Sequence, residues 1–373
     1  MKDNSFYITF IDSAYYTIYR HSDPMKVFFI VVLAVVLNSC YRNSNNNSGQ
    51  ETNSADNSVT TNTATDSTLV AINQRIASDP GNFKNYLDRA KYYSTLEMYD
   101  NAFQDIARAL AADSTKAEIF LVKGDVYWKR KQIKEAYNEY SRCVELDGTN
   151  TDCLLNKSGI DIALRNYDKA REHINAALQQ NEFLPYAYYL RGRMYKELKD
   201  TNMSASSYKT AIEVDPNYYD AYIEVGLLYA EQKNDLAKEY YNSAIAIKPR
   251  SVEAWYNKAM FLQETGFKDK KRYNEAFACY DSILTIDKNF VASHFNKGYI
   301  FLEYMQRYDS ASFYFTKALQ QYPQYYQAYY NRGLSYESMN KRKEAEADYR
   351  MALSIQPDYT DAAISLNRIL NGR

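Results

Sequence analysis

Residues 185–218 read PYAYYLRGRMYKELKDTNMSASSYKTAIEVDPNY, and this stretch decides the fold. Two apolar-periodic segments of helical length are separated by a short polar turn. The small residues Gly192, Ser204 and Ala211 alternate with large ones at helical spacing, which places small and large side chains on one face of each helix. Pro216 ends the second segment because proline cannot continue a helix. The stretch therefore predicts a pair of helices that approach each other closely.

The same pattern recurs along residues 83–359 and makes the chain a repeat protein. A small residue near the middle of each first helix returns after 34, 34, 34, 34, 33, 39 and 35 residues. A period near 34 is typical of stacked helix-turn-helix units. The eight marker residues are Ala90, Gly124, Ser158, Gly192, Gly226, Ala259, Gly298 and Gly333.

The pattern resembles the tetratricopeptide repeat over 277 residues. The resemblance implies an all-α fold, a right-handed superhelical solenoid of about eight helix-turn-helix repeats within residues 69–373. Capping helices are expected at its open ends, one from residue 69 to 79 and one within 360–373. The expected repeats are 83–116, 117–150, 151–184, 185–218, 219–251, 252–290, 291–325 and 326–359.

Composition agrees with a folded chain and names no partner. There are 45 Lys and Arg against 46 Asp and Glu, so the net charge of -1 argues against nucleic acid as a partner. Only 11 Gly and 7 Pro, together with 39 Tyr and 46% hydrophobic residues, exclude a collagen-like or wholly disordered chain.

The N-terminus is predicted to carry a bacterial lipoprotein signal peptide over residues 25–39. Residues 1–24 lack an apolar run and are interpreted as an upstream extension, which favours Met25 over Met1 as the true start. The 11 apolar residues from 27 to 37 are too few to span a membrane but fit a signal core. Residues 37–40, LNSC, resemble the lipobox, which implies lipidation of Cys40. An ordinary signal peptide or a buried strand is the alternative.

The residues after Cys40 bear on location. The resemblance to bacterial lipoproteins implies an anchor in the outer membrane, facing the periplasm, because Tyr41 and not an acid follows Cys40. Display on the cell surface stays open. Residues 40–68 are predicted to form a disordered tether, since 18 of the 28 residues after Cys40 are Asn, Ser or Thr. As a flexible coil, the tether spans roughly 30 Å.

Three departures from a regular repeat carry further predictions. The sixth repeat has a long internal turn with basic residues from Lys268 to Arg272, either a solvated turn or a contact to a partner or to lipid headgroups. A basic residue precedes seven of the eight markers, and in three repeats a carboxylate stands 16 residues later, which predicts ion pairs between the paired helices. These three pairs are Arg89 with Asp105, Lys123 with Glu139 and Arg332 with Asp348. Asp161 replaces an aromatic residue in the third repeat and predicts a weak joint there.

No catalytic motif is visible, so we expect no enzyme, no cofactor and no metal site. His173 and His294 lie in different repeats. Each is expected to be an exposed or packed helix residue and not part of a catalytic or metal site. Cys143 and Cys279 occupy packing positions, where cysteine behaves as a small hydrophobe. A disulfide between Cys143 and Cys153 is the alternative in an oxidising periplasm, and it would join the second repeat to the third.

The resemblance implies that the first helix of each repeat lines an inner groove, which suits an extended peptide or a partner helix. Asn257, Asn296 and Asn331 share one position in repeats six to eight and resemble the asparagine ladder that holds a peptide backbone in some family members. The alternative is that Asn is simply frequent at this position. The remaining predicted groove residues are Tyr256, Phe295, Tyr330, Met260, Tyr299 and Leu334, with Glu253, Glu264, Glu303 and Glu337 as an acidic rim.

The sequence thus predicts a membrane-anchored scaffold that binds protein partners through the groove, in envelope assembly, secretion or pilus machinery. The acidic rim suggests a partner segment with Lys or Arg among apolar residues. A different hypothesis is a binding protein for glycan or peptidoglycan fragments, because aromatic ring faces suit sugars. The sequence does not fix the oligomeric state.

Overall fold

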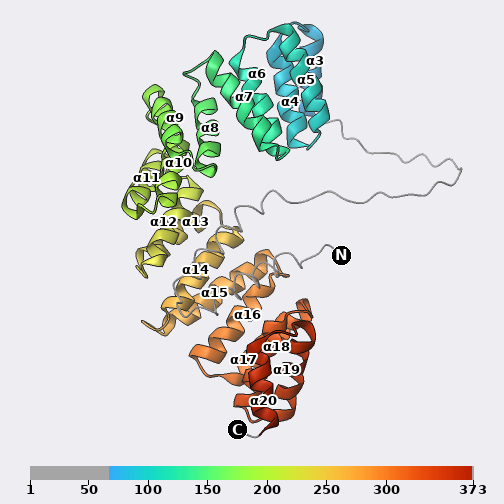
Figure 1. The fold of residues 1–373 in the computed structure, drawn as a ribbon, viewed down its shortest axis with the longest axis vertical. Coiled ribbons are helices and arrows are strands. Elements are labelled where there is room, and N and C mark those ends of the chain that lie inside the picture. The colour runs from blue at the N-terminus through green and yellow to red at the C-terminus, as the bar shows by residue number, and fades with distance from the viewer. Residues whose placement is uncertain (1–66, 372–373) are drawn as a thin grey trace, which may run out of the picture. The chain divides into compact units, whose positions relative to one another are not determined.

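The computed structural model describes residues 67–371, and over this range the chain forms helices and connecting turns with no strand (Figure 1). The predicted all-α repeat fold is confirmed. The extension, the signal peptide, Cys40 and the tether up to residue 66 lie outside the described residues. The first described helix begins at Ser67, so the last two residues assigned to the tether are helical and the predicted boundary at residue 69 is two residues late.

The chain divides at Tyr222 into two compact units. The N-terminal unit holds a capping helix, four complete helix pairs and the start of α12: α3 (Ser67–Ser78), α4 (Phe83–Thr95), α5 (Tyr99–Ala112), α6 (Ala117–Lys129), α7 (Ile133–Leu146), α8 (Thr151–Ala163), α9 (Tyr167–Gln180), α10 (Pro185–Glu197), α11 (Thr201–Val214) and α12 (Tyr219–Glu231). The C-terminal unit holds the rest of α12, followed by α13 (Leu236–Ile247), α14 (Val252–Thr265), α15 (Lys271–Ile286), α16 (Val291–Tyr299), η2 (Ile300–Tyr304), α17 (Tyr308–Gln321), α18 (Tyr326–Ser338), α19 (Arg342–Ile355) and α20 (Thr360–Leu370).

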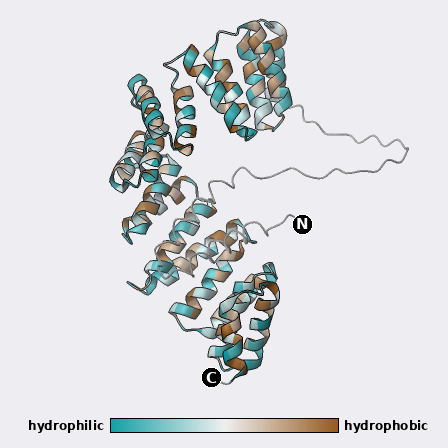
Figure 2. Ribbon diagram, in the orientation of Figure 1, coloured by the Kyte–Doolittle hydropathy of each residue, from teal (hydrophilic) through white to brown (hydrophobic). Residues whose placement is uncertain are grey.

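Each expected repeat contains one pair, helix A followed by helix B. Local sequence fixes where the A helices begin. Pro185 opens α10, where a missing N–H is harmless. The Asn150 side chain accepts a hydrogen bond from the Cys153 amide at 3.1 Å, and Ser251 accepts one from the Ala254 amide at 3.2 Å, so both cap their helices. Every helix carries both hydrophobic and hydrophilic residues (Figure 2).

The two helices of a pair meet where a ring of helix B lies on a glycine of helix A. A Cβ atom added to Gly124 would lie 2.5 Å from Cε1 of Tyr140, far inside the contact distance. Four further markers have the same arrangement: Gly192 under Tyr208, Gly226 under Tyr241, Gly298 under Phe315 and Gly333 under Tyr349. Glycine is therefore required at these positions because the ring fills the space of a side chain.

The size of the helix-B residue that packs on the marker explains why the marker is not glycine in some repeats. The first and third repeats have Ile106 and Ile174 in place of the ring, and their markers are Ala90 and Ser158. A smaller side chain on helix B leaves room for a Cβ on helix A. The sixth repeat departs from this rule, with Ala259 paired to Tyr280. There the close glycine contact is instead between Gly266 and Tyr273.

Two irregular repeats explain the unequal marker spacing. In the sixth, the inserted residues lengthen α15 and the turn before it. Arg272 donates to both carboxylate oxygens of Asp235 at 2.9 and 2.7 Å, and Lys268 Nζ donates to the Lys233 carbonyl at 2.6 Å. Two basic residues of this turn thus bind the turn of the preceding repeat. In the seventh, the π-helix η2 absorbs one extra residue after Tyr299.

The predicted ion pairs form in all three repeats. Arg89 binds both oxygens of the buried Asp105 at 2.7 Å, Arg332 binds Asp348 at 2.8 and 2.7 Å, and Lys123 lies 2.8 Å from Glu139. The same cations also reach back by 16 residues, Arg89 to Asn73 at 2.7 Å and Arg332 to Thr316 at 3.0 Å. One arginine therefore links its own helix B to the preceding repeat or capping helix.

We expect Gly124→Ala to lower the free energy of unfolding by roughly 1–3 kcal/mol, because the new methyl group meets the Tyr140 ring. Urea unfolding measures the effect. Gly148→Ala is the matched control, since a Cβ at Gly148 would meet only the Val144 carbonyl oxygen, at an ordinary 3.7 Å, and the substitution should change stability by less than about 0.5 kcal/mol. Adding Tyr140→Ile to Gly124→Ala, the combination found in the first repeat, should recover part of the loss. Equal unfolding midpoints for the two glycine variants would contradict the assigned contact.

Candidate functional site

The predicted groove residues lie on the helix-A wall, defined here as positions 2, 5, 6, 9, 12 and 13 of helix A in each repeat. Their aromatic members turn out to join repeats. The Phe295 ring lies 4.8 Å from Tyr325 and 5.5 Å from Phe315, and Phe295 is only 3% exposed. Its assignment to an open groove is corrected, because a ring buried in the core between repeats cannot meet a ligand.

Tyr256 and Tyr330 form equivalent ring clusters and are half-buried. Tyr256 lies 6.4 Å from Tyr280 of helix B and 5.6 Å from Phe290, the last residue of its repeat. Tyr330 lies 5.8 Å from Tyr349 and 5.1 Å from Tyr359. In the N-terminal unit, Tyr189, Tyr208 and Tyr218 make the same three-ring cluster, with both spacings at 5.6 Å. Their rings already contact neighbouring aromatic rings in tilted or edge-to-face arrangements.

The three predicted ladder amides differ in their surroundings. The Asn296 side chain is buried, and its Nδ2 donates to the Tyr256 hydroxyl at 3.4 Å and to the Met260 sulfur at 3.6 Å. Asn331 Nδ2 donates to the Gln327 carbonyl of its own helix at 2.9 Å. Asn257 is half-exposed. Two of the amides therefore hold neighbouring wall residues, and the ladder toward a ligand stays a prediction.

The other two apolar groove residues are half-buried. Tyr299 makes an edge contact with Tyr304 of η2 at 5.9 Å, and Leu334 packs against the core around Phe315. With Met260, which accepts from the Tyr280 hydroxyl at 3.4 Å, they line the wall as partly covered apolar surface.

The carboxylates of the predicted acidic rim differ in their surroundings. Glu337 accepts from both Arg368 nitrogens at 2.9 and 2.8 Å and from the Tyr349 hydroxyl at 2.7 Å, which ties the capping helix α20 to the last repeat. Burial alone would raise the pKa of Glu337, but these hydrogen bonds outweigh it and lower the pKa. Burial raises the pKa of Glu264 to about 7, against the opposing charge of Lys233. Glu253 is half-exposed and Glu303 exposed.

Tyrosine hydroxyls of helix B reach the wall from beneath. Tyr140 donates to Asp125 at 2.9 Å, Tyr280 to Gln263 at 2.8 Å and Tyr349 to Glu337 at 2.7 Å. The acceptors occupy position 9 or 12 of helix A. Because each ring lies across its helix-A partner, its hydroxyl points to the wall.

The fourth and fifth repeats depart from this rule. Positions 9 and 12 are Arg193 and Lys196 in the fourth repeat and Leu227 and Ala230 in the fifth, and none of these side chains is an acceptor. In the fifth repeat, the Tyr241 hydroxyl has no hydrogen-bond partner among the described residues. Tyr241 is also fully buried. Burial raises its pKa well above the usual value, and the charges of surrounding glutamates add to this effect. The glutamates whose charges raise the Tyr241 pKa are named here the glutamate cluster, which consists of Glu264, Glu224, Glu231 and Glu253.

The glutamate cluster was not predicted as a site from the sequence. Two of its members, Glu224 and Glu231, lie in the fifth repeat, where Glu224 interrupts the asparagine ladder. The signal that could have revealed it is the absence of an acceptor at Leu227 and Ala230 in a repeat whose helix B carries a tyrosine.

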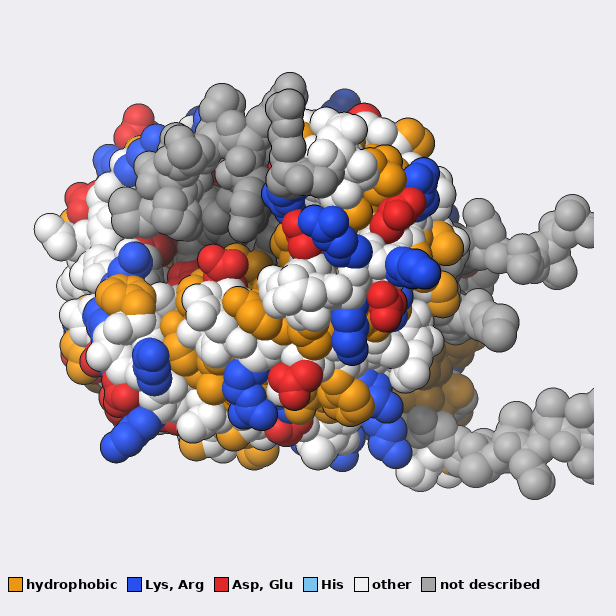
Figure 3. Space-filling model, turned by 90° about the horizontal axis from the view of Figure 1, so that it is seen from below, with side chains coloured by type: hydrophobic (Ala, Val, Ile, Leu, Met, Phe, Trp, Pro, Cys, Tyr) orange, Lys and Arg blue, Asp and Glu red, His pale blue; other side chains and the backbone are white. Residues whose placement is uncertain are grey.

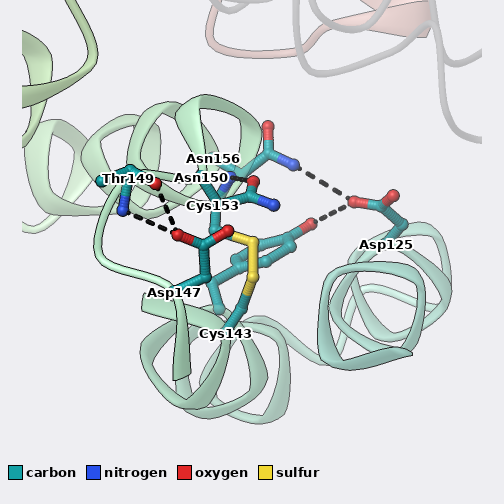
Figure 4. The surroundings of a disulfide bond; sticks show 8 residues. Asp125, Cys143, Asp147, Thr149, Asn150, Cys153 and Asn156 are labelled. Atoms are coloured by element: carbon teal, nitrogen blue, oxygen red, sulfur yellow. Dashed lines mark hydrogen bonds between the residues drawn. A yellow bond between two sulfur atoms is a disulfide. The ribbon is translucent and has the colours of Figure 1, made fainter. Parts of the chain in front are cut away.

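The N-terminal unit has a smaller polar site on its own wall (Figure 4). Asp125 accepts from Tyr140 at 2.9 Å and from Asn156 Nδ2 at 3.2 Å. Burial raises the pKa of Asp125, and the Tyr140 hydrogen bond opposes the shift. Beside it, Cys143 of α7 and Cys153 of α8 form a disulfide, with Cα atoms 6.1 Å apart. The alternative of a disulfide between the second and third repeats is the one that the structure contains.

The third repeat has a polar centre where the sequence predicted a weak joint. Asp161 is fully buried, accepts from the Tyr137 hydroxyl at 3.1 Å and lies 3.2 Å from Nδ1 of His173. Burial lowers the pKa of His173, and the charge of Lys157 lowers it further. The third repeat is therefore joined by polar contacts of Asp161 where other repeats have aromatic packing.

The described residues show no grouping of three His, Cys, Asp or Glu side chains suited to a metal ion, and none of their helices is long and apolar enough to cross a membrane. Burial raises the pKa of the free Cys279 thiol to about 11, which makes it unreactive. On the face shown in Figure 3, basic and acidic side chains alternate with hydrophobic ones.

We expect Glu264→Gln to raise the free energy of unfolding at pH 8 by roughly 1–3 kcal/mol and to leave it nearly unchanged at pH 4. The pKa of about 7 in the folded chain lies above the ordinary value of 4.5, so ionisation of Glu264 disfavours the folded state as the pH rises through this window. Urea unfolding at the two pH values measures the difference. The exposed Glu303→Gln is the control and should show no such pH dependence.

Comparison with known proteins places these helix pairs in a family. The tetratricopeptide repeat model matches residues 117–150, 185–218, 291–325 and 326–359. Anaphase-promoting complex subunit 3 of Schizosaccharomyces pombe is 26% identical over 141 residues, which cover 37% of this chain and 20% of that protein. An uncharacterized protein of Methanocaldococcus jannaschii is 36% identical over 81 residues, 21% of this chain and 83% of that one.

Among solved structures, a tetratricopeptide repeat protein from Parabacteroides merdae is 17% identical, with a TM-score of 0.44 over 68% of this chain and 99% of that one. The chain spans between a fifth and a third of the length of the first curated relatives it matches. Their whole-protein activities are therefore not carried over. On the repeat matches and the helix pairs together, the chain belongs to the tetratricopeptide repeat family.

Proposed function

We propose that the chain is a membrane-anchored scaffold that binds a basic segment of a partner protein on the helix-A wall of its fifth and sixth repeats. Tetratricopeptide repeats in general are scaffolds for protein–protein interaction and not enzymes. The observation that carries the finer proposal is the buried Tyr241 hydroxyl, which lacks a partner among the described residues and lies within the field of the glutamate cluster.

The other repeats explain why this hydroxyl points to a ligand. Where helix B carries a tyrosine in the second, sixth and eighth repeats, helix A supplies an acceptor at 2.7–2.9 Å. A buried hydroxyl without a partner costs free energy, so an acceptor from outside would remove that cost. A backbone carbonyl of an extended segment is a suitable acceptor.

The glutamate cluster sets the charge of the partner. Four glutamates whose charges raise the pKa of Tyr241 disfavour an anionic ligand and favour Lys or Arg side chains. Binding of a cation keeps Glu264 ionised, although its pKa in the free chain is about 7. The affinity should therefore weaken as the pH falls below 7 and as the salt concentration rises.

We expect Glu224→Gln together with Glu264→Gln to reduce capture of the natural partner at least tenfold, about 1.4 kcal/mol. Affinity capture from detergent extracts of the cell envelope, followed by mass spectrometry, measures it at pH 8. The control is Glu239→Gln, an exposed glutamate of α13 in the same repeat. If the double variant captured the same partners with unchanged affinity, the binding surface would not include the glutamate cluster.

The anchor rests on a different part of the chain. We propose that residues 25–39 are a lipoprotein signal and that Cys40 is lipidated, which would place the chain on the outer membrane, facing the periplasm. The Cys143–Cys153 disulfide supports an oxidising compartment, where such bonds persist. It would not be stable in a reducing cytosol.

We expect metabolic labelling with a fatty acid to mark the natural chain and not Cys40→Ala. In the envelope-derived protein, thiol titration after unfolding should find one free thiol, Cys279, because Cys40 is acylated and Cys143 is paired with Cys153. Label on the Ala variant would refute lipidation at Cys40. Three free thiols would refute the oxidising compartment, whatever the labelling shows.

A further inference from the structure

The turns between helix A and helix B expose large apolar side chains in three successive repeats of the N-terminal unit. Trp128 is 48% exposed, Leu164 58% and Leu198 42%. Corresponding turns of stacked repeats are expected at the same edge. Between the first and second turns, Arg130 donates to Asp100 at 3.4 Å. The apolar side chains therefore form a row along one edge, named here the turn edge.

A basic residue stands in the left-handed region of the same three turns. The φ angles are 63° at Lys131, 61° at Arg165 and 61° at Lys199. Glycine is ordinarily favoured there because a Cβ is strained at positive φ. The partial negative charge at the end of helix A accounts for one cation in each turn. It does not account for the exposed apolar side chain beside each cation.

Several cations of the turn edge are free to meet an external anion. No acidic side chain within the described residues pairs with the exposed Lys129, Arg165 or Lys199. Two of the nearby acids are already engaged, whereas Glu135 and Glu197 are exposed beside the same turns. Asp200 accepts from the Met203 amide at 3.0 Å and caps α11, and Asp168 accepts from Arg171 at 3.2 Å.

We propose that the turn edge of the N-terminal unit rests on an anionic lipid surface. Trp prefers the level of the lipid headgroups, Leu side chains enter the acyl boundary, and Lys and Arg attract anionic headgroups. Interleaved apolar and basic side chains at the tips of successive turns suit a flat lipid surface better than an acidic protein, which would match the cations alone. The proposal rests on the membrane anchor proposed above.

The opposite edge of the same unit supplies a matched control. There, the turns between helix B and the next helix A contain Asp113 and Asp147, each of which accepts hydrogen bonds within its own turn. Phe183 on that edge is 70% exposed, so it is an apolar side chain without the flanking cations. Lys116 is a cation on that edge and pairs with Asp113 at 3.4 Å.

The test uses the processed chain, residues 40–373, with Cys40→Ser so that no acyl chain contributes. Flotation with vesicles of phosphatidylcholine containing 30% phosphatidylglycerol should carry the chain up, and vesicles of phosphatidylcholine alone should carry far less. The triple variant Lys129→Gln, Arg165→Gln, Lys199→Gln should lose about a hundredfold in partition, from roughly fivefold for each cation. Trp128→Ala with Leu164→Ala should weaken binding without changing its salt dependence. The control Lys116→Gln with Phe183→Ala should bind like the parent.

Trp128 reports the contact directly, because the chain has 2 Trp residues and Trp255→Phe leaves Trp128 alone. Its emission should shift to the blue when anionic vesicles are added. The proposal is overturned if the parent does not float, if the control variant loses as much as the triple variant, if vesicles bind without a change in Trp128 emission, or if polyglutamate binds the chain and vesicles do not. The Cys40→Ser chain carries no lipid. The result of the vesicle experiment is therefore independent of whether Cys40 is lipidated in the natural chain.

Discussion

The contact between a ring of helix B and a small residue of helix A is the constraint on which the rest of the structure depends. It sets how closely the two helices of a repeat approach, since no side chain fits between the ring and the helix-A backbone. It also fixes the direction of the ring, and the hydroxyl of a tyrosine then emerges at the helix-A wall. One packing contact thereby determines both the core of a repeat and the polar groups available on its surface.

The aromatic residues of the wall extend this constraint from one repeat to the next. In each three-ring cluster, the central ring belongs to helix A, one neighbour to helix B and the other to the last residue of the repeat. Aromatic pairs at these separations stabilise the joint beyond their buried area. Part of the tyrosine content therefore serves joints between repeats, and the glycan-binding hypothesis stays a prediction.

The fold was predictable because periodicity and small-residue spacing act within one repeat, over distances that the sequence shows directly. The ion pair of Arg89 with Asp105 was predictable for the same reason. The role of Phe295 was not, because position 5 of helix A lies at the border between the wall and the next repeat. The contact with the neighbouring Tyr325 places the Phe295 ring in the joint to the next repeat and not on the open wall. The Tyr241 site needed a comparison of several repeats, since it consists of a missing acceptor at Leu227 and Ala230. Lipidation at Cys40 lies outside the described residues and stays a prediction from the sequence.

The disulfide stands at a joint that lacks a ring cluster. The second repeat has Leu121 at position 5 and Asn150 as its last residue, so two of the three ring positions are not aromatic there. The buried Asp161 of the third repeat lies 3.2 Å from Nδ1 of His173. A covalent link from α7 to α8 adds a restraint at this joint, and closing so short a loop contributes roughly 2–3 kcal/mol in the chain-entropy view. The same link holds α7, which carries Tyr140, against α8, which carries Asn156, the two residues that donate to Asp125. The Asn156 contact with Asp125 crosses the joint that the disulfide closes, whereas the Tyr140 contact lies within the second repeat.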